Sequence, residues 1–286
     1  MKVSGFTFLR NAEMLGYPFV QSIKSILPIV DEFIVALGPC EDNTEIKLKE
    51  IDTPKLKIIH TQWNENMRTK GFVYGQQKSI ALFNCTGDWA FYLEADEVIH
   101  EDDLPKIKRA MQKYLNDPDV EALAFDYIHF YGNKNTYIWS PGWYRKEVRI
   151  IKNNLFVWAP KGLFFLVVNN YKRGRYPKAA MTGAKIYHYG WIRSEEQMNL
   201  KLQKVEKYWG KEYKEKKYDK IDPKILREFK GKHPKVIEDW LPPAEGIFRA
   251  DPNYKLTWRE KKHRVLLFFE KLFNLDFSKK HFKLVK

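Results

Sequence analysis

The chain of 286 residues contains only two cysteines, Cys40 and Cys85. Two isolated cysteines form neither a metal-binding motif nor a disulfide framework. This excludes a disulfide-stapled secreted domain and favours a reducing, cytoplasmic compartment. No apolar run approaches the roughly 18 residues that a membrane-spanning helix needs. We also expect no leader peptide, because Lys2 opens directly into a strand-like run.

Positive charge, by contrast, is in excess. The sequence has 50 Lys and Arg against 36 Asp and Glu, which gives a net charge of +14. Such an excess attracts nucleic acid, nucleotide sugars or an anionic membrane, although a lysine-rich surface without any partner explains it equally well. With 44% hydrophobic and 15% aromatic residues, the chain can bury the core of one large domain, alone or with an extension.

Strand-like and helix-like segments alternate in the first 115 residues. The apolar patterns predict strands at residues 3–9, 32–37, 56–59 and 89–93, and helices at 17–25, 44–51, 74–83 and 103–115. This alternation is typical of a parallel sheet with right-handed crossovers. Later strands are predicted at residues 121–131, 147–151, 155–158, 163–168 and 184–189, with a loop at 132–142 and a hairpin turn at 153–154. A capping box at residues 194–197 then opens another helix.

The fourth predicted strand ends in three acidic residues, Glu94, Asp96 and Glu97. Alternate residues of a strand share a face, so we expect the side chains of Glu94 and Asp96 to point the same way. Open α/β sheets bind ligands beyond the carboxyl ends of their strands. Paired carboxylates at that place can hold a divalent cation that bridges a diphosphate. A buried strand with a solvated acidic end would explain the same residues.

Three stretches of the sequence are similar to motifs of one family. They are VSGFTFLRN at residues 3–11, GQQKSIA, GDW and LEADE within residues 75–97, and HYGW at residues 188–191. Over roughly residues 1–200 the chain resembles glycosyltransferase family 2, in particular its bacterial cell-surface glycan type. The resemblance implies an α/β GT-A fold with a Rossmann-like mixed sheet in residues 1–210, and a helical, basic C-terminal extension in residues 211–286. It also implies sugar transfer from a nucleotide-sugar donor, usually with inversion, assisted by Mn²⁺ or Mg²⁺.

The sequence departs from the family's pattern at two places. The metal motif, commonly Asp-x-Asp, reads Glu-Ala-Asp at residues 94–96, and a glutamate can bind a cation through the same carboxylate. Leu-Gly at residues 37–38 replaces the paired aspartates that often follow the second strand. Asp42 therefore becomes the candidate contact to the nucleoside, with a helix cap as the alternative. The metal ligands that the resemblance implies are Asp96, Glu94 and His188.

Donor-binding residues are expected at the end of the first strand and around the third helix. Phe8 can lie against a base, and cations beside a helix N-terminus suit a diphosphate. Core packing of Phe8 and a solvated basic face are the alternatives. The candidates are Thr7, Phe8, Arg10, Asp42, Arg68, Lys70, Gln77, Lys78 and Glu94.

An inverting transfer needs a general base that takes the proton from the acceptor hydroxyl. Glu147 and Asp126 are the candidates, and Glu147 is preferred because it enters a strand after an aromatic loop. An ion pair with Arg145 or Arg149 would explain Glu147 otherwise. Aromatic rings can stack on the sugar or the acceptor, or they can belong to the core. The candidate acceptor-binding residues are Trp139, Trp143 and Tyr144.

Three other functions fit parts of the sequence: a nucleic-acid-binding basic protein, a metal-dependent nucleotidyltransferase on a similar sheet, and a transferase-like scaffold without activity. The basic residues are widely spread and form no known nucleic-acid motif, so no nucleic-acid partner is expected. By the resemblance, the acceptor is a glycan or a lipid-linked intermediate. A basic, apolar helix at about residues 257–275 could lie on the inner face of an anionic membrane, or dock onto the catalytic domain or a second subunit.

Overall fold

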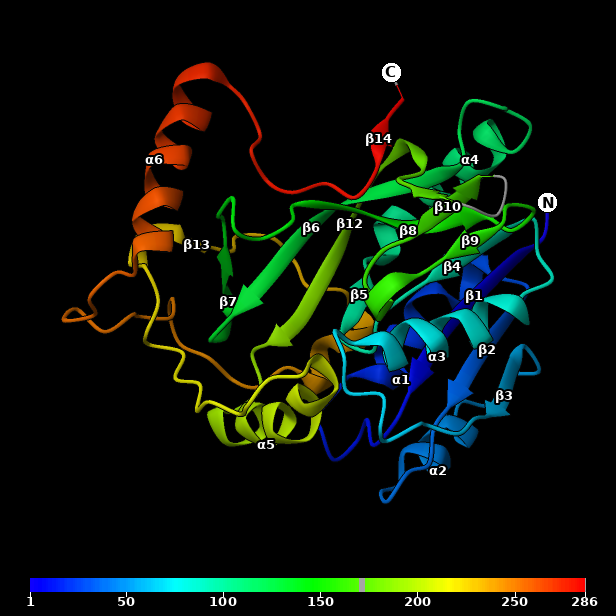
Figure 1. Cartoon of the computed structure of the whole chain (residues 1–286), viewed down its shortest axis with the longest axis horizontal. Coiled ribbons are helices and arrows are strands. Elements are labelled where there is room, and N and C mark those ends of the chain that lie inside the picture. Colours follow the sequence, from blue (N-terminus) through cyan, green and yellow to red (C-terminus); the bar gives the residue numbers. More distant parts are fainter. Residues whose placement is uncertain (170–172, 286) are drawn as a thin grey trace.

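A computed structural model describes residues 1–169 and 173–285. Its main feature is a curled mixed sheet with the strand order β13-β7-β6-β8-β4-β1-β2-β3 (Figure 1). These strands are β1 (Val3–Leu9), β2 (Glu32–Leu37), β3 (Leu56–His60), β4 (Trp89–Tyr92), β6 (Ala122–Tyr131), β7 (Asn133–Ile138), β8 (Lys146–Lys152) and β13 (Leu226–Glu228). The same sheet includes β12 (Lys178–Trp191), which pairs with β6, β5 (Glu97–Ile99) and β14 (Lys283–Leu284). A small second sheet consists of β9 (Val157–Trp158), β10 (Leu166–Asn169) and β11 (Arg173–Arg175).

Six α-helices occur in the described residues. They are α1 (Phe19–Ile26), α2 (Thr44–Lys49), α3 (Phe72–Phe83), α4 (Leu104–Tyr114), α5 (Glu195–Val205) and α6 (Trp258–Phe273). Short 3₁₀ helices flank several of them, including η4 (Glu206–Trp209), which continues α5.

The first half of the chain forms the parallel part of the sheet, as its alternating pattern predicts. β1 pairs in parallel with β2 and β4, and β2 pairs in parallel with β3. β8 then runs antiparallel to β4, which makes the sheet mixed. The parallel strands β1 and β4 therefore end side by side, and the segments that follow them line one edge of the sheet.

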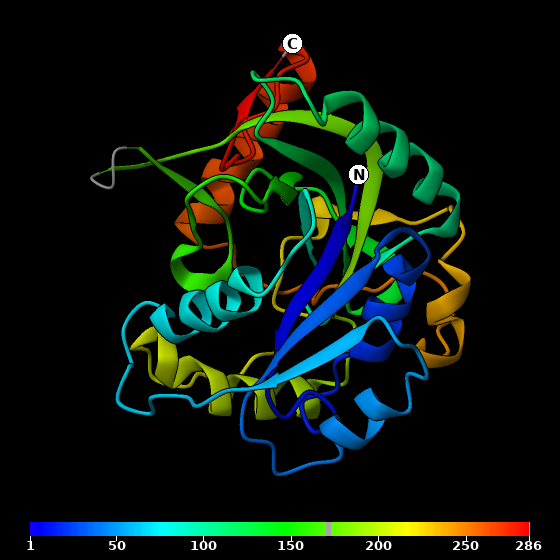
Figure 2. The same cartoon turned by 90° about the vertical axis from the view of Figure 1, so that its right-hand side faces the viewer.

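Helices cover both faces of this sheet (Figure 2). Ile23 of α1 and Met111 of α4 belong to the core on one face, whereas Leu82 of α3 packs with Phe6 of β1 on the other. The strands between these layers read as continuous apolar runs because both of their faces are buried. This packing fixes the ends of β1 and β4 as a rigid base for the loops.

The long strand β12 brings a distant part of the chain to the end of β4. β12 pairs antiparallel with β5, and His188 lies directly opposite Glu97. The backbone N–H of Tyr189 donates to the carbonyl of Asp96 at 2.8 Å. His188 is therefore held next to the acidic turn, although 92 positions in sequence separate it from Asp96.

Three local predictions are wrong. β4 ends at Tyr92, so Glu94 and Asp96 lie in the turn before β5 and do not share the face of one strand. The segment predicted as a loop at residues 132–142 contains β7, an edge-side strand whose polar residues hide its pattern. The predicted hairpin at residues 153–154 does not form, because β9 pairs with β10 and not with β8.

The C-terminal part adds one α-helix and two short strands. β13 pairs with β7 and β14 pairs with β12, so this part is attached to the main sheet at two places. Thr257 and Glu260 form a capping box that starts α6. In the described part of the chain, no helix is both long and apolar enough to cross a membrane. The division of the chain at residue 210 stays a prediction.

Candidate active site

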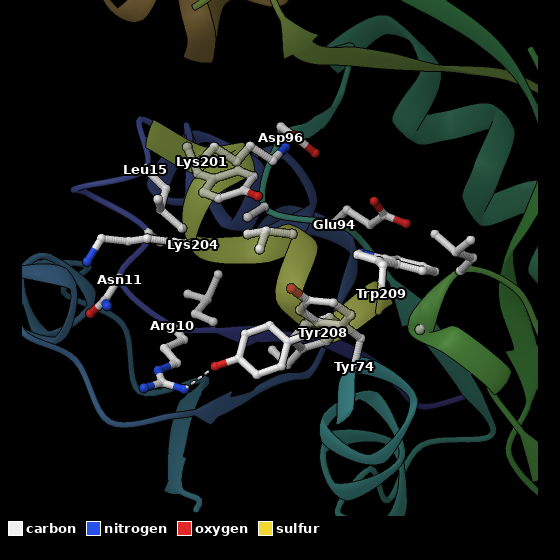
Figure 3. A pocket seen from close by; sticks show the side chains of 18 of the residues that line it. Arg10, Asn11, Leu15, Tyr74, Glu94, Asp96, Lys201, Lys204, Tyr208 and Trp209 are labelled. Atoms are coloured by element: carbon white, nitrogen blue, oxygen red, sulfur yellow. Dashed lines mark hydrogen bonds and ion pairs between the residues drawn. The ribbon is translucent and has the colours of Figure 1, made fainter. Parts of the chain in front are cut away.

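A pocket of about 470 Å³ lies where β1 and β4 end, and α5 and η4 form its opposite wall. Aromatic rings make up much of its lining: Phe8, Tyr17, Trp63, Tyr74, Tyr92, Trp191, Tyr208 and Trp209. In the close view, Asp96 and Lys201 lie at one end of the pocket and Arg10 and Tyr208 at another (Figure 3). Apolar walls with a few converging charged groups are typical of a small-molecule site.

Glu97 holds the acidic turn in place. Its carboxylate accepts hydrogen bonds from Arg149 Nε at 2.8 Å, Tyr127 Oη at 2.9 Å and the backbone N–H of Glu94 at 3.0 Å. The Glu97 side chain is fully buried and does not line the pocket. It therefore fixes the backbone from which Glu94 and Asp96 reach the pocket.

Glu94 faces the pocket and is bonded to Arg149. Arg149 donates to Glu94 Oε1 at 3.0 Å. Burial, together with the negative charge of Glu97, raises the pKa of Glu94 to about 7, and Arg149 opposes this shift only in part. Its carboxylate is thus engaged by a buried guanidinium on one side and open to the pocket on the other.

Asp96 is surrounded by cationic and potentially cationic side chains. Its Oδ2 lies 3.2 Å from Arg193 and 3.6 Å from Lys201, and its Oδ1 lies 3.5 Å from Nε2 of His188. Burial works to raise the pKa of Asp96, but Lys201 and His188 outweigh it and hold this pKa well below its usual range. Asp96 is therefore a permanent anion at the pocket wall.

A second histidine sets the orientation of His188. His129 Nε2 lies 2.7 Å from the carbonyl oxygen of Tyr144, which can only accept, so this nitrogen carries the hydrogen. Burial and the neighbouring His188 lower the pKa of His129 well below its usual value, so its ring is neutral and Nδ1 is an acceptor. His188 Nδ1, 3.0 Å away, must then donate. In its neutral form, His188 therefore directs the lone pair of Nε2 towards Asp96.

The Asp96–His188 pair fits a divalent cation. A lone pair and a carboxylate oxygen face each other across 3.5 Å, close to the roughly 3 Å between adjacent ligands of an octahedral cation. Gly190 leaves this place open, because a Cβ there would lie 2.7 Å from His188 Nε2 and 2.8 Å from Asp96 Oδ2. The described residues contain no group of three or more ligating side chains. Two protein ligands suffice for Mg²⁺ or Mn²⁺ when a diphosphate and waters complete the shell.

Lysines from α5 and η4 give the pocket a cationic wall. Lys201, Lys204 and Lys207 line it at intervals of three residues, which places them on one side of the helical segment. Lys207 Nζ donates to Glu65 at 2.8 Å, and Arg10 bonds the same carboxylate. Burial works to raise the pKa of Glu65, but these bonds outweigh it and lower the pKa to about 2.

The sequence profile described as Glycosyl transferase family 2 matches residues 17–167, more than half of the chain. The chain belongs to glycosyltransferase family 2. The predicted family is thereby confirmed and, together with the mixed sheet and the helical C-terminal part, so is the predicted GT-A fold. No curated protein sequence matches the chain.

Several solved structures are similar to this family 2 chain. Staphylococcus aureus TarS (residues 1–349) is 17% identical, with 57% of this chain and 52% of that chain covered and a TM-score of 0.38. The same fragment in complex with UDP is 14% identical, with 71% and 64% covered and a TM-score of 0.40. Mycobacterium tuberculosis glucosyl-3-phosphoglycerate synthase, with Mn²⁺, UDP and phosphoglyceric acid, is 19% identical, with 44% and 43% covered and a TM-score of 0.31. In the first and third of these matches, the chain thus spans about half the length of TarS 1–349 and of the synthase.

Five of the predicted site residues line the pocket of this family 2 chain. They are Phe8, Arg10, Glu94, Asp96 and His188. Phe8 stacks on Tyr92 with ring centres 6.4 Å apart, at the floor where a planar group can lie. Arg10 donates to the hydroxyl of Tyr208 at 2.9 Å, across the pocket from β1 to η4.

The remaining donor-binding candidates lie elsewhere. Thr7 is buried and donates to the carbonyl of Leu93 at 2.7 Å, and Gln77 is buried beside Thr61. Asp42 accepts from the backbone N–H groups of Met14 and Thr44, a turn-forming role close to the helix cap considered as its alternative. The last two, which are exposed on the loop before α3, are Arg68 and Lys70.

Lys78 is fully buried between aromatic rings. Its Nζ lies 3.7 Å from the ring centre of Tyr92 and 3.9 Å from that of Phe165, and it donates to the carbonyl of Gly162 at 3.3 Å. Burial and the nearby Arg149 lower the pKa of Lys78 well below its usual value. Lys78 thus supports the pocket floor from below and is not among the residues that line it.

Neither candidate base opens onto the pocket. Glu147 is 2% exposed and bonded to Nδ1 of His281 at 2.5 Å, not to the arginines beside it in sequence. Asp126 is paired with Lys146 at 2.5 Å. Both carboxylates are absent from the pocket lining.

The three candidate acceptor-binding aromatics also lie outside the pocket lining. Trp139 lies beneath Arg145, whose guanidinium carbon is 4.1 Å from the ring centre. Trp143 packs edge-on against Trp191 at 5.4 Å, and Tyr144 packs against Tyr127. Tyr144 nevertheless contributes to the site, because its carbonyl oxygen fixes His129.

Sequence reasoning did not place several residues in the pocket of this family 2 chain. In the sequence, Lys201, Lys204 and Lys207 look like the solvated face of an amphipathic helix. They line the pocket only because α5 lies opposite the ends of β1 and β4. Their spacing of three, in the helical segment that follows the His-Tyr-Gly-Trp stretch, was the available signal. His129 and Gly190 carried no separate signal, since an isolated histidine or glycine in a strand is usually structural.

Proposed function

We propose that this chain is a divalent-metal-dependent glycosyltransferase that moves a sugar from a nucleotide-sugar donor to a glycan or lipid-linked acceptor with inversion. The observation that carries the proposal is the pair of Asp96 and His188, which face each other across 3.5 Å in a pocket with a cationic wall. Action in the cytoplasm, at the inner face of the membrane, is part of the same proposal.

The pocket offers a complementary place for each part of a nucleotide sugar. Phe8 and the rings around it provide an apolar floor for the base, and Lys201 and Lys204 provide charge for the diphosphate. Asp96 lies 3.6 Å from Lys201, and Glu94 lines the same pocket, where the bond to the sugar would break. When bound, a divalent cation neutralises charge that develops on the departing nucleoside diphosphate.

Deprotonation of the acceptor is assigned to a carboxylate, as inversion requires. In the described structure, Glu147 is bonded to His281 and Asp126 to Lys146, so each would need a rearrangement to reach an acceptor hydroxyl. We therefore infer that the acceptor hydroxyl approaches Glu94, the carboxylate that already faces the pocket.

The test is binding followed by product analysis. Thermal unfolding is measured with a panel of uridine, guanosine and cytidine diphosphate sugars, each with and without Mn²⁺; a selective donor at 100 times its Kd adds about 2.7 kcal/mol. Asp96→Asn should remove the metal-dependent part of this stabilisation. Asp126→Asn should retain it, because Asp126 is paired with Lys146 and lies outside the pocket lining. Release of nucleoside diphosphate supports glycosyl transfer, whereas release of pyrophosphate supports nucleotidyl transfer. Unchanged metal dependence in Asp96→Asn would refute the proposed site.

A further inference from the structure

The outward side of α6 is an exposed apolar surface. Its exposed large side chains are Trp258, Val265, Phe268, Phe269, Leu272 and Phe273, which we call the α6 outer face. Trp258 is 77%, Phe268 63% and Leu272 60% exposed. At 100° per residue, these six positions fall on one arc of the helix. An apolar surface of this kind marks an interaction site more often than it marks a solvated helix.

The inward side of α6 is firmly attached to the rest of the chain. Glu270 accepts from Arg145 at 2.7 Å, and Arg264 donates to Asp222 at 2.8 and 2.7 Å. Figure 1 shows α6 beside β13 at the edge of the molecule. Leu267 also packs inward, against the cluster that contains Tyr131 and Ile138, so these contacts lie on the side of the helix opposite the outer face, which stays exposed.

The charges around the outer face are of one sign. Residues 255–286 contain ten Lys or Arg and three Asp or Glu, so this segment carries half of the chain's net charge of +14. Both acidic residues of α6 are engaged: Glu270 is bonded to Arg145, and Glu260 to Thr257 and Tyr254. The exposed charges of α6 are therefore all positive: Arg259, Lys261, Lys262 and Lys271.

We propose that the α6 outer face docks on an anionic lipid bilayer, with the helix lying in the plane of the headgroups. Aromatic and aliphatic side chains enter the acyl boundary, and the surrounding lysines and arginines contact anionic headgroups. A second copy of the chain fits less well, because self-association through this face would bring two sets of unpaired cations together. At 16 residues, α6 cannot cross the bilayer, which agrees with the absence of a spanning helix in the described residues.

The experiment is co-sedimentation of the full chain with vesicles of phosphatidylcholine alone or mixed with phosphatidylglycerol. The wild-type chain should bind the anionic vesicles and be released by salt. Phe268→Ser with Leu272→Ser, and separately Lys261→Glu with Lys262→Glu, should each lower the partition coefficient on the order of tenfold.

Matched controls lie on the catalytic domain. Phe83→Ser removes an equally exposed ring from the end of α3, and Lys108→Glu with Arg109→Glu reverses two exposed cations on α4; both should bind like wild type. Circular dichroism and thermal unfolding verify that every variant is folded. Equal sedimentation of the α6 variants and wild type would overturn the proposal. So would a dimer in sedimentation velocity that the Phe268→Ser, Leu272→Ser variant dissociates, because the occupant would then be a second copy.

Discussion

Replacing His129 with phenylalanine should weaken metal binding without any change to a metal ligand. The ring of His129 accepts from His188 Nδ1 at 3.0 Å and donates to the carbonyl of Tyr144 at 2.7 Å. Phenylalanine fills a similar volume but provides neither contact. His188 then loses the bond that fixes which ring nitrogen carries its hydrogen. Removal of such supporting groups typically costs 10- to 100-fold in metal affinity, which corresponds to about 1.4 to 2.7 kcal/mol.

The same substitution should also destabilise the fold, since it leaves the Tyr144 carbonyl and His188 Nδ1–H without partners, at about 1–3 kcal/mol each. His233→Phe is the matched control, because His233 is bonded to Tyr189 at 2.9 Å and lies outside the pocket lining. It should lower stability and leave metal affinity unchanged. Binding of Mn²⁺ is measured directly by electron paramagnetic resonance, and stability by urea unfolding. If His129→Phe binds Mn²⁺ as tightly as wild type while His188→Ala does not, the orienting role of His129 is refuted.

Three further predictions concern single side chains. Gly190→Ala should abolish Mn²⁺ binding in the same resonance assay, because the Cβ of the new alanine would occupy the space between His188 and Asp96. The melting temperature should stay within a few degrees of that of the wild type. Retained Mn²⁺ binding would place the cation elsewhere. Lys201→Met should weaken nucleoside diphosphate binding on the order of tenfold in calorimetry, since one charge-assisted contact is lost; an unchanged Kd would assign Lys201 to Asp96 alone. Burial works to raise the pKa of Glu32, but bonds from Lys57 and Thr86 outweigh it and lower this pKa to about 2. The stability from Glu32 is therefore present above its unfolded pKa of 4.5 and lost as the pH falls towards 2. Glu32→Gln should cost up to about 3 kcal/mol at pH 7 in urea unfolding, and the difference from wild type should shrink below pH 5; a pH-independent difference would contradict this.

The parallel half of the fold could be predicted because its signals are local. Strands buried on both faces, such as β2 and β4, appear as short apolar runs, and helices such as α4 show an apolar stripe. β7 could not be predicted in this way. It has mostly polar residues and owes its strand conformation to pairing with β6 and β13. Pairing between distant segments leaves little trace in either sequence.

The site residues, too, could be predicted only where their signal is local. Asp96 and His188 could be selected because each belongs to a familiar motif, although His188 lies within β12 and not at the end of a strand, and the fold brings them together. The cationic wall and the role of His129 depend on where β12 and α5 lie relative to the sheet. No local sequence pattern encodes that placement. Glu147 was chosen for its place in the sequence, and its actual partner, His281, lies 134 positions away.

That pair also ties an interior strand to residues that the ribosome adds late. A chain that folds during synthesis orders its N-terminal half first. Until residue 281 has been translated, the carboxylate of Glu147, which is 2% exposed in the finished structure, lacks its histidine partner. The backbone N–H of Val148 still donates to Glu147, but a buried carboxylate with fewer partners costs stability, so we expect the sheet around β8 to be less stable until His281 has docked. Docking of the C-terminal segment that carries His281 should therefore stabilise β8 in the middle of the sheet.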